Sequence, residues 1–224
     1  MKIGLVIPWR EQPHRIHLLK VLQNWYQTNL PNIDIFYADK PGEFWSSSGS
    51  RNLGVKKAQE AQCDVIIIND ADTIPEIKPL LEAIKACKQD NMVHNPYSHC
   101  KVFSEEETTR YFNGAELNKI YCQTISTLSN GGIYVTTPEA WWSVGGQDEK
   151  FIQWGYEDTA FELAHQIIKG VPLIKHEGYI YSLYHKQQFH DNGYVENHFK
   201  NKEVYLKYRN IKSIEELLEL IKSN

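Results

Sequence analysis

The stretch Val65-Ile66-Ile67-Ile68-Asn69-Asp70-Ala71-Asp72 decides the fold expected for this chain. Its β-branched residues predict a short strand that is buried on both faces, as strands are inside a parallel sheet. Asp70 and Asp72 follow at the carboxyl end of that strand, where open α/β sheets bind their ligands. In an extended backbone these two side chains share one face, so they can bind one cation or its waters. Alternatively, the pair belongs to a turn in which Asp72 caps a helix that opens at Pro75 and Glu76.

The composition is that of an ordinary globular protein. The 224 residues are 42% hydrophobic and 23% charged, which suits one sizeable α/β domain with a complete core. The net charge of −4 excludes a whole-protein field that attracts nucleic acid or anionic membranes. Thirteen Tyr and six Trp favour a surface that stacks on sugar rings or bases.

The cysteines and the N-terminus bear on location. Cys63, Cys87, Cys100 and Cys122 have no paired spacing, which predicts neither a zinc site nor a disulfide framework and favours a reducing compartment. Met1 leads directly into a predicted strand, with no signal peptide and no long apolar run. We therefore expect no membrane anchor and a cytoplasmic location, in a bacterium or in the host cytosol of a virus. The sequence indicates no oligomeric state.

Strands alternate with helices through the first 96 residues. We expect strands at residues 2–8, 33–37, 65–68 and 92–95, and helices at 12–29, from the end of the loop 44–52 to about 62, and at 76–88. This alternation predicts a mainly parallel sheet with right-handed crossovers. Beyond residue 97 the pattern is weaker. There we expect strands at 131–135 and 179–185, helices at 105–118, 138–144 and 214–221, and an amphipathic helix that starts near Glu157 and Asp158 and is ended by Gly170.

A second pair of carboxylates, Glu157 and Asp158, begins the helix that Gly170 ends. A helix N-terminus stabilises carboxylates, so capping explains the pair in one interpretation. Trp154 and Tyr156 flank the pair with aromatic surface, which capping does not require. A general base that takes a proton from a sugar hydroxyl needs a carboxylate held near a stacking platform. The segment is therefore a candidate site for proton transfer.

Other polar residues lie at the ends of predicted elements. His185 follows a strand, and any single histidine is more often a surface or hydrogen-bonding residue than a ligand. Two carboxylates nevertheless leave coordination positions that an imidazole can fill. Arg10 and Arg51 offer guanidinium forks to phosphate oxygens. The serine run at 46–50 lacks the Gly-Lys-Ser/Thr of a Walker loop and is interpreted as a flexible loop.

Four segments, taken in order, resemble the GT-A glycosyltransferases. The likeness is to the β-1,4-galactosyltransferase type, with its relatives among chondroitin-polymerase and polypeptide-GalNAc-transferase domains. Val6-Ile7-Pro8-Trp9-Arg10 resembles the Pro-aromatic-Arg segment at the nucleotide. Ser50-Arg51-Asn52-Leu53-Gly54 resembles the Arg-Asn-x-Gly helix start, and Asp70-Ala71-Asp72 matches the metal-binding Asp-x-Asp.

The fourth segment comprises Gly145-Gly146-Gln147-Asp148-Glu149 and Trp154-Gly155-Tyr156-Glu157-Asp158. It is similar to the Gly-Gly-x-Asp-Glu and Trp-Gly-Gly-Glu-Asp motifs of the family, whose last Asp is the base of inverting members. His185 falls where the family carries a late histidine ligand, so the resemblance spans residues 3 to 186. Each motif is weak alone, but four in the right order are hard to produce by accident.

The resemblance implies an α/β fold of GT-A type. This fold has a Rossmann-like, mainly parallel central sheet flanked by helices, with a smaller acceptor-side half. We expect one domain over residues 1–224. Its parts are a nucleotide-sugar-binding half at 1–96, an acceptor and catalytic half at 97–190, and a C-terminal helical extension at 191–224.

The resemblance also implies a metal-dependent inverting enzyme that moves a sugar from a nucleotide sugar, chiefly a UDP-sugar, to a hydroxyl of a saccharide. Mn²⁺ or Mg²⁺ would be held by Asp70, Asp72 and His185. Asp158 would be the catalytic base, and Glu157 would bond a sugar hydroxyl. The implied nucleotide-binding residues are Pro8, Arg10, Asp39, Arg51 and Asp70, and the implied substrate-binding residues are Trp154, Gly155, Tyr156 and Gly132.

Two positions depart from the family pattern. Tyr156 replaces a glycine, which predicts a stiffer acceptor loop or one that stacks differently. Ser182 stands where the galactosyltransferases place a methionine ligand, so the preference between Mn²⁺ and Mg²⁺ stays open.

Two alternative functions follow from other features. Residues 184–212 carry six Lys or Arg against three acids, interleaved with Phe189, Tyr194, Phe199, Tyr205 and Tyr208. This pattern fits a nucleic-acid surface and an acceptor that is a hydroxymethylated base in DNA, as in a phage. It equally fits a solvated helical region whose aromatic residues pack on the domain. The second alternative is a non-catalytic module that binds sugar or nucleotide, which has no need of Asp158 beside the metal pair.

Overall fold

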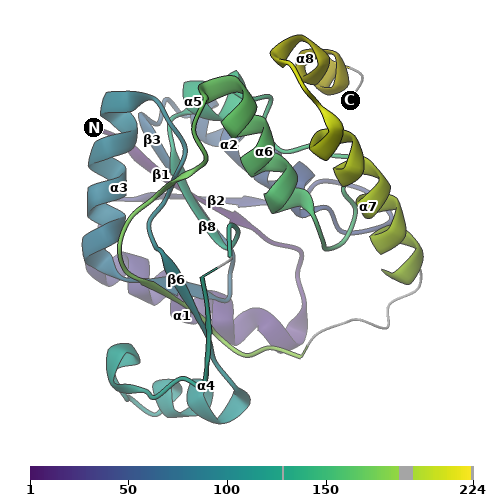
Figure 1. Ribbon diagram of the computed structural model, residues 1–224. Helices are drawn as coiled ribbons and strands as arrows, with labels where there is room; N and C mark the ends of the chain where they lie inside the picture. The colour runs from purple at the N-terminus through teal and green to yellow at the C-terminus, as the bar shows by residue number, and fades with distance from the viewer. Residues whose placement is uncertain (128, 187–193, 223–224) are drawn as a thin grey trace.

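A six-stranded sheet forms the centre of the molecule (Figure 1). The computed structural model describes residues 1–127, 129–186 and 194–222. The strands lie in the order β2 (Asp34–Ala38), β1 (Ile3–Pro8), β3 (Val65–Asn69), β8 (Ile133–Thr136), β5 (His94–Asn95) and β9 (Ile174–Lys175). β1 is parallel to both β2 and β3, as the sequence predicts, and β5 is parallel to β9. β8 is antiparallel to β3 and β5, so the sheet is mixed where the second half of the chain enters it.

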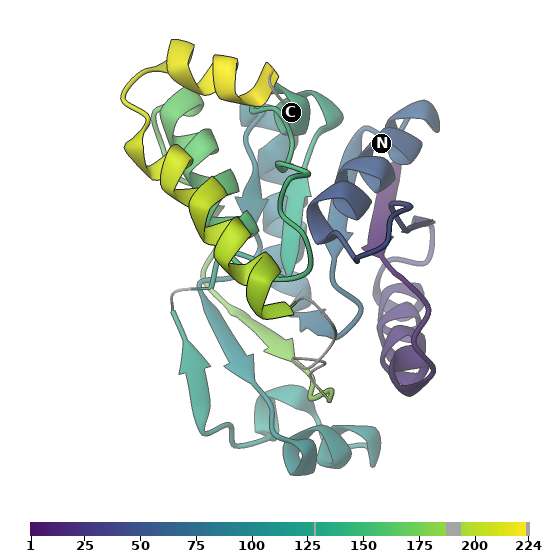
Figure 2. The same ribbon diagram turned by 90° about the vertical axis from the view of Figure 1, so that its right-hand side faces the viewer.

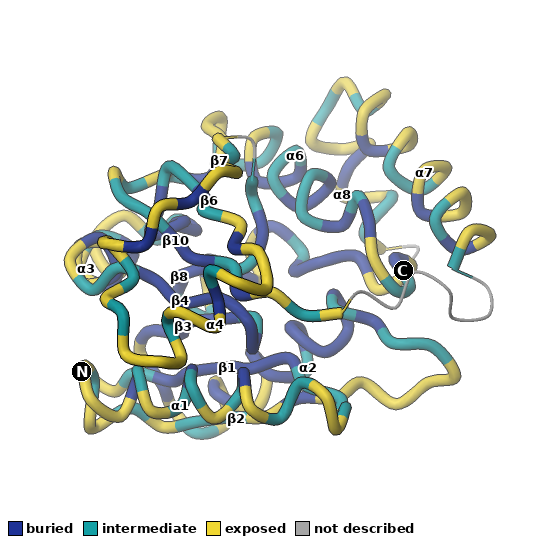
Figure 3. The backbone as a smooth tube through the Cα atoms, turned by 90° about the horizontal axis from the view of Figure 1, so that it is seen from below, coloured by how far each residue is buried: buried dark blue, intermediate teal, exposed yellow. Residues whose placement is uncertain are grey.

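Both faces of this sheet are covered by helices. Every residue of β3 is buried, which explains why its sequence is apolar without alternation. α1 (Ile16–Asn29) and α3 (Ile77–Asp90) share one core with Leu5, Ile7 and Ile67. On the other face, a second core with Val6, Ile66 and Ile68 includes residues of α2 (Ser47–Glu60), α5 (Pro138–Ser143) and α6 (Glu157–Lys169). In Figure 3 the backbone of these central strands is coloured dark blue, which marks buried residues.

A smaller, four-stranded sheet begins where the central strand ends (Figure 2). Its order is β4 (Thr73–Pro75), β10 (Tyr179–Ser182), β6 (His99–Val102) and β7 (Thr124–Ser126). Only β10, with the sequence Tyr-Ile-Tyr-Ser, was expected. The sequences of β4 (Thr-Ile-Pro), β6 (His-Cys-Lys-Val) and β7 (Thr-Ile-Ser) are as short and contain no comparable run of apolar and aromatic residues. Pro75 lies in β4 and α3 begins at Ile77, so Asp72 does not cap that helix.

The predicted loop at residues 44–52 is wrong from Ser47 onward, because α2 begins there. Ser46 caps the helix, with its Oγ accepting a hydrogen bond of 3.0 Å from the amide of Gly49. A Cβ at Gly54 would lie 2.1 Å from the Val6 side chain, so the absence of a side chain there lets α2 pack on β1. The serine run is therefore a capped helix start that packs against the sheet.

The remaining helices lie outside these layers. Two 3₁₀ turns are η1 (Pro13–Arg15) and η2 (Leu117–Lys119). The helix expected at 105–118 ends earlier, as α4 (Glu105–Phe112), because the chain turns at Gly114 with φ +92°. α7 (Tyr194–Asn210) and α8 (Ile214–Lys222) pack with α6 in a third apolar cluster that includes Phe151, Tyr208 and Leu217. None of the described helices combines the length and hydrophobicity that a membrane span needs.

Candidate active site

One cavity of about 1030 Å³ brings together nearly all the residues that the sequence singled out. It opens at the carboxyl ends of β1 and β3, between the end of β10 and the turn before α6. The predicted residues that line it are Pro8, Arg10, Arg51, Asp70, Asp72, Gly132, Trp154, Gly155, Tyr156, Glu157, Asp158 and His185. Asp39 does not line the cavity but accepts a hydrogen bond from Arg10, which does.

Asp72 and His185 meet on one wall. The Asp72 Oδ2 lies 2.8 Å from His185 Nε2 and 2.9 Å from Arg15 Nη2. The end of β10 is fixed beside Asp72 because the Leu183 amide donates to the Asp72 carbonyl at 2.8 Å. Burial alone would raise the pKa of Asp72, but the hydrogen bond from His185 and the charge of Arg15 lower it below its usual value.

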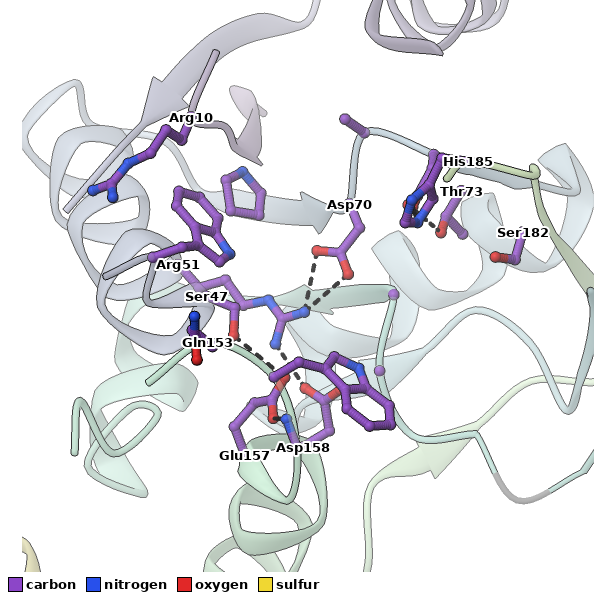
Figure 4. A pocket seen from close by; sticks show the side chains of 18 of the residues that line it. Arg10, Ser47, Arg51, Asp70, Thr73, Gln153, Glu157, Asp158, Ser182 and His185 are labelled. Atoms are coloured by element: carbon purple, nitrogen blue, oxygen red, sulfur yellow. Dashed lines mark hydrogen bonds and ion pairs between the residues drawn. The ribbon is translucent and has the colours of Figure 1, made fainter. Parts of the chain in front are cut away.

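Asp70 faces the opposite wall (Figure 4). Both of its oxygens accept hydrogen bonds from Arg51 Nη2, at 3.1 and 3.0 Å. The Arg51 Nη1 donates to Asp158 Oδ1 at 2.6 Å and to Gln147 Oε1 at 3.0 Å. Arg51 is only 2% exposed, and although burial lowers its pKa, Asp70 and Asp158 raise it well above the usual value. Arg51, expected at a phosphate, thus pairs with carboxylates that belong to both predicted acidic sites.

The hydrogen bonds that described residues donate to the Asp158 carboxylate all go to one of its oxygens, Oδ1. Its Oδ1 also accepts hydrogen bonds from the Tyr134 hydroxyl at 2.6 Å and from Gln147 Nε2 at 3.2 Å. No described residue donates to its Oδ2, which lies against Gly131: a Cβ there would be 1.9 Å away. All these contacts come from side chains, so the capping interpretation does not account for Asp158.

Glu157 is buried beneath the same turn, with 5% of its surface exposed. Its Oε2 accepts from the amide of Gly155 at 2.8 Å, and its Oε1 accepts from Ser47 Oγ at 3.3 Å. Burial, together with the nearby charge of Asp158, raises the pKa of Glu157 to about 7. The contact with the turn amide agrees with the capping interpretation for this residue.

Three of the expected nucleotide-binding residues, Pro8, Arg10 and Asp39, lie at or just beyond the ends of β1 and β2. Arg10 Nη2 lies 2.8 Å from Asp39 Oδ1, and its guanidinium is 5.6 Å from the centre of the Trp45 ring. Pro8, the last residue of β1, lines the cavity beside them. A stacking ring and a guanidinium fork at strand ends form a surface suited to a nucleotide.

The sequence interpretation assigned no role to Arg15, Tyr134, Gln147 or Gly131. Gln147 lies within a quoted motif, at its variable position. Arg15 contacts Asp72 from 57 residues earlier, and no local pattern connects the two. Pairs so distant in sequence carry no periodic or capping signal.

The donor types of Asp70, Asp72 and His185 fit a divalent cation, since Mn²⁺ binds both carboxylate and imidazole and Mg²⁺ prefers carboxylate. Their arrangement fits in part. Within the described residues, no group of three or more His, Cys, Asp or Glu side chains is arranged as a metal site. Asp72 contacts His185, but Asp70 is turned to Arg51, so binding by all three requires Asp70 to leave Arg51.

Comparisons with known proteins agree with this architecture. Residues 114–186 match the family model described as the N-terminal domain of galactosyltransferase. No curated protein sequence matches the chain. The catalytic domain of Drosophila β1,4-galactosyltransferase 7, in complex with xylobiose, superposes with a TM-score of 0.59 at 18% identity, covering 96% of this chain and 83% of that one.

Two further structures superpose less closely. A mutant of the same Drosophila enzyme, with manganese, UDP-Gal and xylobiose, gives a TM-score of 0.51 at 15% identity over 96% of this chain and 83% of that one. GalNAc-T7 with UDP, GalNAc and Mn²⁺ gives 0.51 at 11% identity, covering 99% of this chain and 54% of that one. These findings confirm the predicted resemblance: the chain has the GT-A fold of nucleotide-sugar glycosyltransferases, and residues 114–186 are similar to the galactosyltransferase family model.

Proposed function

We propose that this chain is a metal-dependent inverting glycosyltransferase that moves a sugar from a UDP-sugar to a hydroxyl group of a saccharide. The observation that carries the proposal is the position of Asp158, which shares one cavity with Asp70, Asp72 and His185. The solved complexes of similar fold contain manganese with UDP-Gal and xylobiose, or Mn²⁺ with UDP and GalNAc. A binding module without catalysis has no use for a carboxylate positioned by three side chains.

The donor side of the site consists of strand ends. Asp70, Asp72 and His185 would hold Mn²⁺ or Mg²⁺, which when bound neutralises charge on the diphosphate leaving group. Pro8, Arg10 and Asp39 would bind the nucleoside at the ends of β1 and β2. Arg51, buried between the two walls, orients Asp70 and Asp158 relative to each other.

The acceptor side consists of the turn before α6. Asp158 would take the proton of the acceptor hydroxyl on Oδ2 while Oδ1 stays bound to Arg51, Tyr134 and Gln147. The acceptor oxygen forms a bond to the anomeric carbon as the bond from that carbon to the diphosphate oxygen breaks. Attack from the face opposite the diphosphate inverts the configuration. Glu157 would hydrogen-bond a sugar hydroxyl, and Trp154 and Gly132 would contact the sugars.

The C-terminal helices support a saccharide acceptor over a DNA base. Tyr208 packs against Phe151 and donates to Asp148 Oδ2 at 3.0 Å, and Tyr205 stacks on Tyr156, so these aromatic rings pack on the domain. Lys200 pairs with Glu196 on the same helix. Phe189 lies outside the described residues.

A donor screen tests the proposal. The chain is incubated with Mn²⁺ and a panel of UDP-sugars, and the released UDP is measured with and without a chelator. Turnover of one donor that needs the metal is expected. Asp158→Asn should lower its kcat by about 10²–10⁴-fold while the affinity for UDP stays unchanged, because only proton transfer is lost. Glu116→Gln, which removes an exposed acid paired with Lys119 outside the cavity, is the matched control. A near-normal kcat for Asp158→Asn would rule out the assignment of the base.

A further inference from the structure

Helix α7 contributes to the wall of the cavity beside the turn that precedes α6. Tyr194 and His198, from the first turns of α7, line the cavity together with Trp154 and Tyr156. The helix approaches the turn closely at Gly155, where a Cβ would lie 3.0 Å from His198 Nδ1. The acceptor side is therefore built from two segments that are distant in sequence.

Two buried asparagines fix α7 against this turn. Asn201 accepts a hydrogen bond of 3.1 Å from the Ile152 amide and donates one of 2.9 Å to the Ile152 carbonyl. Asn197 donates to Gln153 Oε1 at 3.1 Å. Buried amides that satisfy backbone groups set a unique position for the helix, because any other register would leave polar atoms unpaired.

The same helix holds the turn in a strained backbone. Tyr156 has φ +71°, a conformation that favours glycine, and it occupies the position where the resembled family carries glycine. Its ring stacks on Tyr205 of α7, with centroids 5.1 Å apart and planes at 21°, and contacts His198 at 5.2 Å. These contacts offset the strain, so the turn offers a rigid platform that loses little entropy when a ligand binds.

Aromatic rings on this platform lie in nearly parallel planes. Trp154 is 61% exposed, and its plane makes 14° with that of His198 at a centroid distance of 6.4 Å. The plane of Tyr194 makes 22° with that of His198 at 6.2 Å. Tyr194 and His198 are half-buried beside the exposed Trp154. A cavity wall lined by aromatic rings suits flat ligands with an apolar face, such as pyranose rings or bases.

The positive charges in the cavity wall distinguish between a sugar ring and a nucleic-acid base as the ligand. Among the described residues of α7, no Lys or Arg lines the cavity. Of the cations that line it, Arg10, Arg15 and Arg51 are each paired with an aspartate, and Lys186 is a single further cation. A nucleic-acid strand needs a row of cations that follows its phosphates beside the stacking rings. The aromatic wall lacks such a row in the described part of α7, which favours an uncharged sugar ring.

We propose that Trp154, His198 and Tyr194 form an outer acceptor subsite for a second sugar ring, so that the acceptor is an oligosaccharide of at least two rings. The inference rests on the proposed function, since it assigns the acceptor of the same cavity. The ring that carries the reacting hydroxyl lies at Asp158, and the next ring stacks on the aromatic row.

An acceptor series tests this inference. The chain, Mn²⁺ and whichever UDP-sugar it hydrolyses are applied to an array of monosaccharides, the matching disaccharides and longer glycans, with DNA containing 5-hydroxymethylcytosine as a further acceptor. We expect kcat/KM to be at least about tenfold higher for a disaccharide than for its monosaccharide. His198→Ala should reduce this ratio towards one, while His198→Phe, which keeps a ring, should retain most of it.

Phe199→Ala is the matched control, because Phe199 is the next residue of α7, is 62% exposed and does not line the cavity. It should leave the ratio unchanged, and melting curves show whether each variant is folded. Equal rates on monosaccharides and disaccharides, transfer to the DNA alone, or no glycan acceptor at all would overturn the inference. Absence of any metal-dependent donor turnover by the wild-type chain would instead refute the proposed function together with this inference.

Discussion

The two walls of the cavity each pair an arginine with an aspartate, but they differ in burial and in partners. The wall that carries Asp72, Arg15 and His185 is called the strand-end wall. There Asp72 contacts both Arg15 and His185, and Arg15 keeps 23% of its side chain exposed. The wall that carries Arg51, Asp70 and Asp158 is called the helix-start wall. There Arg51 is buried and shared between Asp70 and Asp158. The strand-end wall suits the binding and release of a cation, since the His185 imidazole and the Asp72 carboxylate are already in contact there. The helix-start wall suits the fixed positioning of a base.

The backbone segment from Asp70 to Asp72 is where the two walls of the cavity separate. By sequence it belongs with Asp72, but the chain bends between them as β3 ends and β4 begins. The Asp70 amide donates to the Gly132 carbonyl at 2.8 Å, whereas the Asp72 carbonyl accepts from Leu183 at 2.8 Å. The two carboxylates therefore face opposite walls, and in the proposed mechanism Asp70 would couple cation binding on one wall to Asp158 on the other.

The largest expected effect comes from removing the buried arginine. Arg51→Met leaves Asp70 and Asp158 without their shared partner and should lower the free energy of unfolding by about 3–5 kcal/mol. Arg15→Met should cost only about 1 kcal/mol, because Arg15 is partly exposed and Asp72 keeps His185. Urea denaturation of both variants measures the difference. Equal losses would contradict the contrast between the walls.

The two walls should respond to pH with opposite sign. The pKa of Glu157 is raised to about 7, so the folded state holds this proton more tightly than the unfolded state. Its contribution to stability is complete below about pH 4.5 and is lost as the pH rises to about 7, by roughly 3 kcal/mol. The pKa of Asp72 is lowered, so its contribution is present above the unfolded pKa and is lost as the pH falls.

Metal-free denaturation between pH 3 and 8 measures these contributions by comparing the wild type with Glu157→Gln and with Asp72→Asn. Gln stands in for the protonated form of Glu157, so Glu157→Gln should match the wild type at low pH and become more stable than the wild type as the pH rises. The stability that Asp72→Asn loses relative to the wild type should shrink as the pH falls. Parallel pH curves for the two variants would be inconsistent with the burial and charges described.

Cation affinity should depend on the strand-end wall. His185→Ala and Asp72→Asn should each weaken Mn²⁺ binding in the presence of UDP by about 10–100-fold, because each removes a ligand atom. Titration followed by electron paramagnetic resonance measures free Mn²⁺ directly. His99→Ala, which removes a half-buried histidine of β6, is the control and should bind Mn²⁺ as the wild type does. Unchanged affinity in His185→Ala would remove this residue from the metal site.

The smallest effect tests the placement of the base. A Cβ at Gly131 would lie 1.9 Å from Asp158 Oδ2, so Gly131→Ala should displace the carboxylate and lower kcat by about tenfold. Gly114→Ala is a matched glycine substitution with nothing within 4 Å of the added Cβ, and it should affect stability but not kcat. Steady-state kinetics of donor hydrolysis distinguish the two. A fully active Gly131→Ala would mean that this contact does not position Asp158.

Much of the central sheet could be predicted from the sequence because β1 and β3 are continuous apolar runs that only burial on two faces explains. The strands β4, β6 and β7 could not, because they are short and mix polar with apolar residues, unlike the equally short β8 and β10 with their apolar and aromatic runs. Serine favours both caps and flexible loops, so the start of α2 was misjudged. The meeting of Asp72 with His185 was anticipated from motif order, but the shared use of Arg51 was not, because it depends on long-range packing.

The configuration of the released sugar tests the central claim most directly. If the leaving group is held at the strand-end wall and Asp158 activates the attacking group at the other wall, attack occurs from the face opposite the diphosphate. Proton NMR of an α-linked UDP-sugar hydrolysed with Mn²⁺, recorded before mutarotation, should show the β-anomer first. First appearance of the α-anomer would contradict the division of the cavity into a leaving-group wall and a base wall.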